Sequence, residues 1–215
     1  MNKAREQVLW GCRTMCARGY ALGTSGNISA RVEGTDLFVI TPTSVPYEGL
    51  SPDDLVVADL SGTIVEGARH PSIEFSMHRA ILEKRPDVAA IVHTHSAYAT
   101  AAGSTKGVSV VPLVDIESAL YLGGDIRVAP FAPPGTPELA ESVAESLGFA
   151  AGVILESHGA VGVGGTMEAA MTAADILERT CLIYMTARAA GGAKPLPEAY
   201  LARCLAESAR KRGVS

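Results

Sequence analysis

Hydrophobic residues recur with a helical spacing at the start of the chain and in short strand-like runs soon after it. Within residues 3–18, apolar side chains occupy positions 8, 9, 12, 15 and 16, which predicts an amphipathic helix. The next apolar runs are short and bounded by glycine, proline and polar residues, so they predict strands. These runs are Ile28–Val32, Leu37–Thr41, Leu55–Leu60 and Thr63–Val65.

Helical and strand-like segments alternate along the rest of the chain. Ser72 is placed to cap a helix that runs to about Arg85, and Thr136-Pro137 begins another helix. Two continuous apolar runs, Val88–Val92 and Gly152–Leu155, predict strands buried on both faces. Further helices are expected at residues 96–102, 116–122, 166–190 and 198–211. The pattern predicts an α/β fold in which residues 1–215 form a single layered domain, a central sheet with helices packed on it.

Composition narrows the class of protein. Of the 215 residues, 47% are hydrophobic and the formal net charge is −5, so the chain lacks the basic character that binding to nucleic acid or an anionic membrane requires. No apolar run reaches the roughly 18 residues of a membrane span. The N-terminal sequence has no continuous apolar signal core, and we expect a cytoplasmic protein. The four cysteines form no Cys-x-x-Cys pair, which argues against a thiolate zinc site.

Three histidines follow the two buried strands. His93 and His95 come directly after Val88–Val92, and alternate residues of a strand point to the same side, so both imidazoles are expected to project together. His158 follows the second strand, and Gly159 permits a tight turn after it. Three imidazoles with an open fourth position form a catalytic site of the zinc type, which Mn²⁺ or Co²⁺ also fits. A structural, hydrogen-bonded pair is the alternative for His93 and His95.

Glu74 has two interpretations. If Ser72 is the N-cap of the helix, Glu74 lies in the first turn and would pair with Ser72 as in a capping box, which is the interpretation that local sequence favours. The other interpretation is a general acid/base beside a metal ion. We expect His78, one turn later, to be an ordinary helix residue and His70 to lie at the surface. The loop from Gly23 to Asn27 can offer N–H groups to an anion, with a plain turn as the alternative.

Taken in order, these segments resemble the class II aldolase/adducin family, most closely its L-fuculose-phosphate aldolase branch. The matching stretches span most of the chain: Gly23-Thr24-Ser25-Gly26-Asn27-Ile28-Ser29, Ile40-Thr41-Pro42-Thr43-Ser44, Pro71-Ser72-Ile73-Glu74 with His78, Ala90-Ile91-Val92-His93-Thr94-His95, and Ser157-His158-Gly159. The resemblance implies an α/β domain with a central mixed or antiparallel sheet flanked by helices. It also implies a homotetramer with active sites at the subunit interfaces.

The resemblance assigns roles to individual residues. The metal ligands would be Glu74, His93, His95 and His158, with zinc as the expected ion and Mn²⁺ or Co²⁺ as alternatives. Glu74 would also be the catalytic acid/base, against the local capping interpretation. The residues expected to bind the substrate and its phosphate are Gly26, Asn27, Thr43, Ser44 and Ser72. The implied reaction is cleavage of a ketose 1-phosphate, such as L-fuculose 1-phosphate, to dihydroxyacetone phosphate and an aldehyde through a metal-stabilised enediolate.

Two departures from the family pattern bear on the substrate. Ile73 stands where the family has a second serine, and Ser44 stands where it has a glycine. Tyr121 is the nearest counterpart, out of register, of a tyrosine that some aldolases lend across the interface. Three other enzymes of the superfamily therefore stay open: a sugar-acid phosphate decarboxylase, a methylthioribulose-phosphate dehydratase and a pentulose-phosphate 4-epimerase. A non-enzymatic scaffold like the adducin head domain is the alternative from another class.

Overall fold

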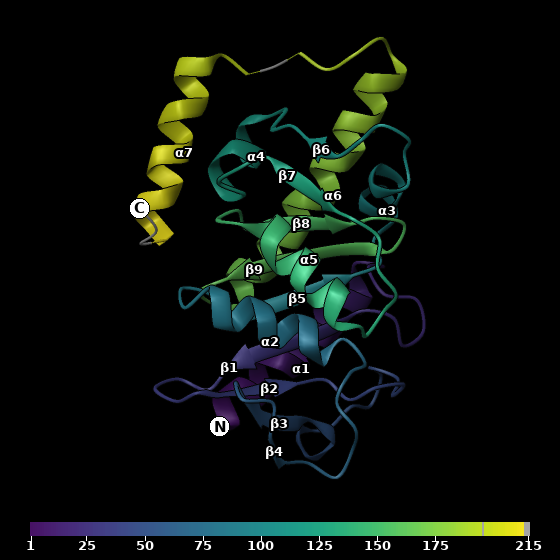
Figure 1. Ribbon diagram of the computed structural model, residues 1–215, viewed down its shortest axis with the longest axis vertical. Helices are drawn as coiled ribbons and strands as arrows, with labels where there is room; N and C mark the ends of the chain where they lie inside the picture. The colour runs from purple at the N-terminus through teal and green to yellow at the C-terminus, as the bar shows by residue number, and fades with distance from the viewer. Residues whose placement is uncertain (195, 213–215) are drawn as a thin grey trace.

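The computed structural model describes residues 1–194 and 196–212, and within them the strands form one mixed sheet (Figure 1). Neighbouring strands follow the order β4-β3-β2-β1-β5-β9-β8-β7-β6. β7 and β8 run parallel, and the other neighbouring pairs are antiparallel. The strands are β1 (Asn27–Arg31), β2 (Leu37–Ile40), β3 (Val56–Asp59), β4 (Ile64–Glu66), β5 (Ala90–Thr94), β6 (Val110–Val111), β7 (Ile126–Ala129), β8 (Gly152–Leu155) and β9 (Gly159–Gly164).

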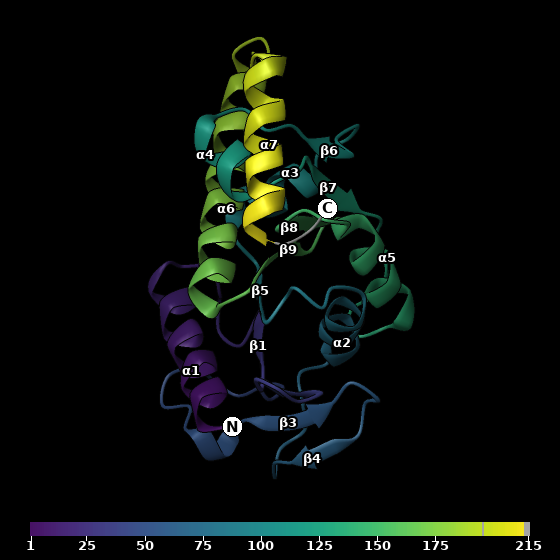
Figure 2. The ribbon, with the colours of Figure 1, turned by 90° about the vertical axis from the view of Figure 1, so that its left-hand side faces the viewer.

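Helices cover both faces of this sheet. Figure 2 shows α1 and α6 on one side of the strands and α2 and α5 on the other. The helices are α1 (Asn2–Ala17), α2 (Phe75–Lys84), α3 (Ala97–Gly103), α4 (Ile116–Tyr121), α5 (Pro137–Leu147), α6 (Met167–Ala189) and α7 (Glu198–Arg212), with a 3₁₀ turn at Pro52–Asp54. No helix in the described part of the chain combines the length and apolar character needed to cross a bilayer.

The central strand β5 is buried on both faces, which explains its continuous apolar run. Ile91 packs in the core cluster shared with α2 and α5, whereas Ala90 and Val92 pack in the cluster shared with α1 and α6. Because side chains alternate along a strand, His93 shares the face of Ile91 and so faces the α2 layer. The expected fold class, a central mixed sheet flanked by helices, is confirmed.

Several predicted boundaries differ from the observed ones. The strand expected at Val88–Val92 lies at Ala90–Thr94, so His93 is inside the strand and not beyond it. Ser72 is not the N-cap of α2, because a turn precedes the helix and Glu74 occupies the cap position without a side-chain cap bond. The hydrophobic pattern does not predict β6, β7 and β9, which are present in the structure. Gly159 begins β9, and the left-handed residue of the preceding loop is Ser157, with φ of 55°.

Candidate metal centre

One carboxylate and three imidazoles converge where the central strand β5 and strand β8 reach their carboxyl ends. The ligand atoms offered by Glu74, His93, His95 and His158 all lie within 4.8 Å of one another. His93 Nε2 lies 3.1 Å from both His95 Nε2 and Glu74 Oε2, and His158 Nε2 lies 3.3 Å from Glu74 Oε1. The structure therefore brings together the four residues that the sequence predicts as metal ligands.

The ends of the central strands position the three histidines. His93 and His95 are two residues apart at the end of β5, and the His95 N–H donates to the Tyr20 carbonyl, 2.9 Å away. His158 lies in the three-residue loop that joins β8 to β9, where its N–H donates to the Leu155 carbonyl. This loop approaches β5 closely, because a Cβ on Gly159 would lie 2.2 Å from the Thr94 carbonyl oxygen. A glycine at the start of β9 thus allows His158 to reach the β5 histidines.

Glu74 reaches the cluster from the turn before α2. The Ser72 hydroxyl accepts a bond of 3.3 Å from the Glu74 N–H, but the Glu74 carboxylate does not return to the Ser72 backbone as a capping box requires. The carboxylate instead accepts a bond of 2.8 Å from Asn27 Nδ2 at Oε2 and faces His93 and His158. The capping-box interpretation of Glu74 is therefore wrong.

Charge and burial set the protonation of the cluster. Burial opposes ionisation of Glu74, but the His93 charge and hydrogen bonds from His93 and Asn27 hold the pKa of its carboxyl well below the usual range. Burial likewise opposes a charge on His93, and the adjacent Glu74 carboxylate nevertheless raises the His93 pKa. Burial, followed by the charges of His93 and His158, lowers the pKa of His95 to about 4. Burial and the His93 charge also lower the pKa of His158.

This donor set fits a divalent metal ion. His93 Nδ1 lies 3.0 Å from the Ala160 carbonyl oxygen, so the Nδ1–H donates there and Nε2 is left to face the cluster. His95 and His158 are kept neutral, as metal ligation requires, and cation binding would displace the His93 proton. Glu74 Oε1 is buried without a hydrogen-bond partner in the described structure, which is costly unless a cation faces it. Three imidazoles and a carboxylate are ligands that zinc accepts.

The residues predicted to bind substrate surround Glu74. Ser72 is two residues away and buried, and the Ser72 N–H donates to the Thr41 carbonyl. The segment with Thr43 and Ser44 is tied to the same turn, because the Thr43 N–H donates to the His70 carbonyl at 3.0 Å. Ser44 is exposed and adopts a φ of 56°. Binding of substrate by these three residues stays a prediction.

Gly26 and Asn27 lie on the other side of Glu74. Gly26 has a φ of +75°, and its carbonyl accepts a hydrogen bond from the buried Tyr47 hydroxyl. The Asn27 side-chain amide points at Glu74 and His78. Each polar atom of the Asn27 amide therefore has one protein partner, and the second N–H of the NH₂ group has none assigned among the described residues.

His78 is a buried histidine behind the cluster that the sequence pattern does not reveal. His78 is fully buried, with Nε2 2.6 Å from Asn27 Oδ1 and Nδ1 2.7 Å from Ser29 Oγ, whereas we expected an ordinary helix residue. The available signal was its spacing, since His78 follows Glu74 by one helical turn and Ser29 follows Asn27 by two strand positions. His70 is exposed, as expected.

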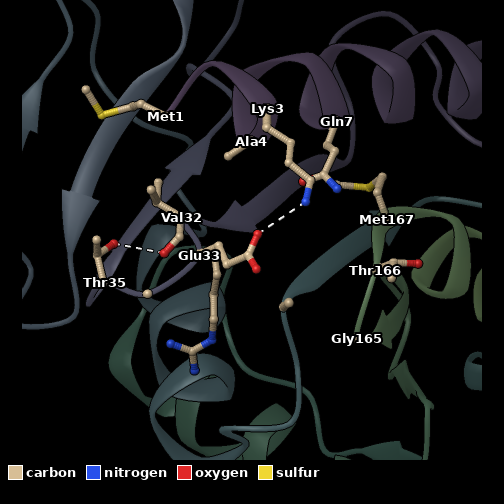
Figure 3. Close-up of a pocket in the computed structure, with 13 residues that line it drawn as sticks. Met1, Lys3, Ala4, Gln7, Val32, Glu33, Thr35, Gly165, Thr166 and Met167 are labelled. Carbon is tan, nitrogen blue, oxygen red and sulfur yellow. Dashed lines mark hydrogen bonds and ion pairs between the residues drawn. The ribbon is translucent and has the colours of Figure 1, made fainter.

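A separate surface pocket lies at the opposite ends of β1, β5 and β9 (Figure 3). It is lined by residues from the start of α1, from the turn after β1 and from the start of α6, among them Lys3, Glu33 and Thr166. Lys3 and Glu33 form an exposed ion pair of 3.2 Å across it. The pocket contains none of the four clustered residues and no histidine.

Comparison with known families gives one match that covers most of the chain. The model of the class II aldolase and adducin N-terminal domain matches residues 6–185. This range includes all four residues of the cluster, together with His78 and the predicted substrate-binding residues. It ends within α6, so α7 lies outside the match.

Individual relatives are similar over nearly their whole length. A 5-deoxy-D-ribulose 1-phosphate aldolase of Bacillus thuringiensis is 34% identical over 198 residues, covering 92% of each chain. An L-fuculose phosphate aldolase of Escherichia coli K12 is 35% identical over 185 residues, covering 86% of this chain and 84% of the relative. Among solved structures, an L-fuculose 1-phosphate aldolase superposes with a TM-score of 0.90 at 28% identity, covering 96% of each chain.

Proposed function

The chain belongs to the class II aldolase and adducin family, and we propose from this that it cleaves a ketose 1-phosphate to dihydroxyacetone phosphate and an aldehyde. Its relatives are named aldolases, and the chain is an enzyme of this lyase class. The observation that carries the proposal is the convergence of Glu74 with three imidazoles in a chain of this family. A scaffold has no need for four buried or half-buried ligating groups within 4.8 Å of one another.

The cofactor is a divalent metal ion held by Glu74, His93, His95 and His158. We propose zinc, and Mn²⁺ or Co²⁺ fit the same ligands. When bound, such an ion polarises the carbonyl and hydroxyl oxygens of a ketose and stabilises the negative charge that develops during cleavage. His95 and His158 would face the ion as neutral imidazoles, and His93, oriented by the Ala160 carbonyl, would give up its Nε2 proton to the binding of the ion.

Glu74 is the proposed acid/base. Cleavage breaks the bond between carbons 3 and 4 of the ketose, so a proton must leave the carbon-4 hydroxyl and one must reach carbon 3. Glu74 would deliver the proton to carbon 3, and in the reverse direction it would remove it. The buried position and the low pKa of Glu74 keep a carboxylate ready for proton abstraction, while Asn27 holds one of its oxygens in place.

Two substrates deserve direct comparison. The sequence resemblance favours L-fuculose 1-phosphate, whereas the relative aligned over 92% of each chain is named for 5-deoxy-D-ribulose 1-phosphate. Cleavage between carbons 3 and 4 would release dihydroxyacetone phosphate from both, with lactaldehyde from the first and acetaldehyde from the second. Gly26, Asn27, Thr43, Ser44 and Ser72 are the proposed phosphate and substrate contacts. Ile73 has an exposed side chain beside them and offers no hydrogen bond.

The test is metal analysis followed by a substrate panel. We expect one divalent ion per subunit, lost in a His93→Ala/His95→Ala double variant, and formation of dihydroxyacetone phosphate from a ketose 1-phosphate. Purified protein without a stoichiometric ion would contradict the metalloenzyme. Pentulose 5-phosphates and sugar-acid phosphates complete the panel, because formation of an epimer, of a dehydrated product or of CO₂ would instead identify an epimerase, a dehydratase or a decarboxylase.

Two properties of the whole protein remain proposals. We propose a homotetramer whose active sites lie at the subunit interfaces, in keeping with the exposed apolar side chains Leu22, Ile73 and Phe131. The extent of the single domain over residues 1–215 also stays a prediction, and residues 213–215 lie outside the described part of the chain.

A further inference from the structure

Behind the metal centre, a chain of buried polar side chains leads away from Glu74. Asn27 Nδ2 lies 2.8 Å from Glu74 Oε2, Asn27 Oδ1 lies 2.6 Å from His78 Nε2, and His78 Nδ1 lies 2.7 Å from Ser29 Oγ. Asn27, Ser29, Glu74 and His78 are all buried, and His78 and Ser29 have no exposed surface at all. Buried polar atoms of this kind are costly unless each donor meets an acceptor. The hydrogen bonds from Glu74 to Ser29 must therefore have a defined order of donors and acceptors.

The direction follows from the charge on Glu74. A carboxylate only accepts hydrogen bonds, so the Asn27 amide must present its NH₂ to Glu74 and its carbonyl oxygen to His78. The oxygen requires a donor, which makes His78 the Nε2–H tautomer. His78 Nδ1 is then an acceptor, and the Ser29 hydroxyl donates to it. If the Asn27 amide were rotated by 180°, its oxygen would face the Glu74 carboxylate oxygen, and two buried acceptors would repel each other.

Burial supports a neutral His78. Burial, followed by the positive charge of His93, lowers the pKa of His78 to about 3, although the Glu74 carboxylate acts in the opposite direction. A neutral ring has one donor and one acceptor nitrogen, which match the Asn27 oxygen on one side and the Ser29 hydroxyl on the other. The match accounts for every polar atom of the imidazole.

The pairing of β1 with β5 and the position of α2 bring Asn27, Ser29 and His78 onto the same face of the sheet. Asn27 pairs with His93, and Ser29 pairs with Ile91 across β1 and β5, so Asn27 and Ser29 occupy the sheet face that is covered by α2. His78 follows Glu74 by four residues, one turn of α2, and descends onto that face. The hydrogen bonds consequently link the first turn of α2 to β1 directly beneath the carboxylate.

We propose that His78 is a positioning residue for the metal centre, which acts through Asn27 to hold Glu74 Oε2 and leave Oε1 free toward the metal and substrate. The proposal rests on the proposed function insofar as Glu74 is a ligand and acid/base. The two carboxylate oxygens differ accordingly: Oε2 accepts from the Asn27 amide and lies 3.1 Å from His93 Nε2, whereas Oε1 lies 3.3 Å from His158 Nε2 and is buried without a hydrogen-bond partner among the described residues. His78 itself touches neither metal nor substrate.

The main experiment is a double-mutant cycle in zinc affinity. Metal-free wild type, His78→Leu, Asn27→Ala and the double variant are titrated with zinc against a chelator of known affinity. Loss of an outer hydrogen-bond partner of a ligand costs about 10–100-fold in metal affinity, so we expect a loss of about tenfold for His78→Leu. Because His78 acts through Asn27, the double variant should bind zinc no more weakly than Asn27→Ala alone.

A matched control separates positioning from general destabilisation. Ile81→Val shortens another fully buried side chain of α2, three residues beyond His78, and leaves the polar chain intact. Its zinc affinity should equal that of wild type. Wild-type affinity in His78→Leu, or losses that multiply in the double variant, would overturn the proposal.

A second pair of measurements covers the case in which leucine prevents folding. His78→Gln keeps one donor and one acceptor, and we expect it to restore zinc affinity to within about threefold of wild type, with kcat reduced less than tenfold and KM unchanged. In the metal-free wild type, nitrogen NMR of the histidine rings should find His78 protonated at Nε2 and unprotonated at Nδ1, and the Nδ1–H tautomer would refute the chain direction. Zinc affinity and tautomer need no substrate, so failure of wild type to cleave any ketose phosphate would contradict the proposed function alone.

Discussion

Single side chains at the metal centre divide their contacts between the cluster and the protein behind it. Glu74 Oε2 faces His93 and also accepts from Asn27, and Glu74 Oε1 faces His158. His93 similarly directs Nε2 into the cluster and Nδ1–H to the Ala160 carbonyl. Rotation of either side chain would break a buried hydrogen bond, so the reacting groups are held in place before any ligand arrives.

Glu74→Gln removes the charge of the proposed acid/base and keeps its shape. We expect kcat to fall by about 10²–10⁴-fold, the usual contribution of a positioned acid/base, because an amide cannot exchange the proton. The three imidazoles stay, so metal should remain bound. Steady-state cleavage and metal analysis of the same sample check both parts, and activity within threefold of wild type would rule out Glu74 as acid/base.

His78→Gln should change how stability depends on pH. The pKa of buried neutral His78 lies near 3 in the folded protein, against 6.5 for an ordinary histidine, so the unfolded chain binds the proton first. For the metal-free protein, the free energy of unfolding should therefore fall as pH drops from about 6.5 toward 3, with His78 contributing up to about 1.4 kcal/mol per pH unit. Denaturant unfolding at several pH values should show a shallower decline in His78→Gln, and identical slopes would contradict the buried neutral ring.

Ile73→Ser tests the altered phosphate site. The Ile73 side chain is 61% exposed, so a serine fits there without repacking, and its hydroxyl can donate to a phosphate. A hydrogen bond to a charged group contributes about 1.5–3 kcal/mol, so KM for a phosphorylated ketose should fall about tenfold. Ile73→Ala is the control, since it removes the bulk without adding a donor. Equal KM values in the two variants would show that the hydroxyl makes no contact.

The limits of prediction are clear from these residues. The His-x-His spacing places two imidazoles together in any strand, so His93 and His95 could be predicted locally. Glu74 could not, because a glutamate in the first turn after Ser72 also suits a capping role, and only the family resemblance pointed to the metal. His78 looked like an ordinary helix residue, since its partners Asn27 and Ser29 come from a strand about 50 positions earlier.

At the scale of elements, prediction followed the strength of the local signal. The first helix and the helices that begin after Thr136 and Thr166 are predicted from the sequence and are present. β6 has only two residues, which leaves too few positions for an alternating pattern to be detected. β9 contains three glycines, which have little strand propensity. Close packing against α6 requires a glycine at position 162, because a Cβ there would lie 2.7 Å from the Ala174 nitrogen.

Gly159→Ala should disrupt the pairing of β9 with β5. The added Cβ would lie 2.2 Å from the Thr94 carbonyl oxygen, so a backbone must shift. We expect destabilisation of about 2–3 kcal/mol, and loss of zinc affinity because His158 is displaced from His95. Gly165→Ala is the control, since its Cβ would meet only ordinary contact at 3.7 Å. Thermal unfolding and zinc titration provide the readouts. Wild-type values in Gly159→Ala would show that the loop can accommodate a Cβ at position 159 without displacing His158.

At the scale of the whole molecule, the proposed tetramer predicts a dependence on concentration. If each active site lies between subunits, specific activity should fall on dilution as subunits separate, and the fall should coincide with dissociation. Sedimentation should give four times the subunit mass of 22.3 kDa at high concentration. Activity that persists in a monomer would contradict sites shared between subunits.

The position of β5 has a consequence for the life of the protein after synthesis. This strand joins the sheet half made from β1–β4 to the half made from β6–β9, and the proposed ligands reach the same point from both directions along the chain. A bound cation would therefore cross-link segments that are far apart in sequence and hold the two halves closed. Subunits that lack the ion would then open more often and be degraded sooner, so the supply of metal would set the abundance of the protein as well as its activity.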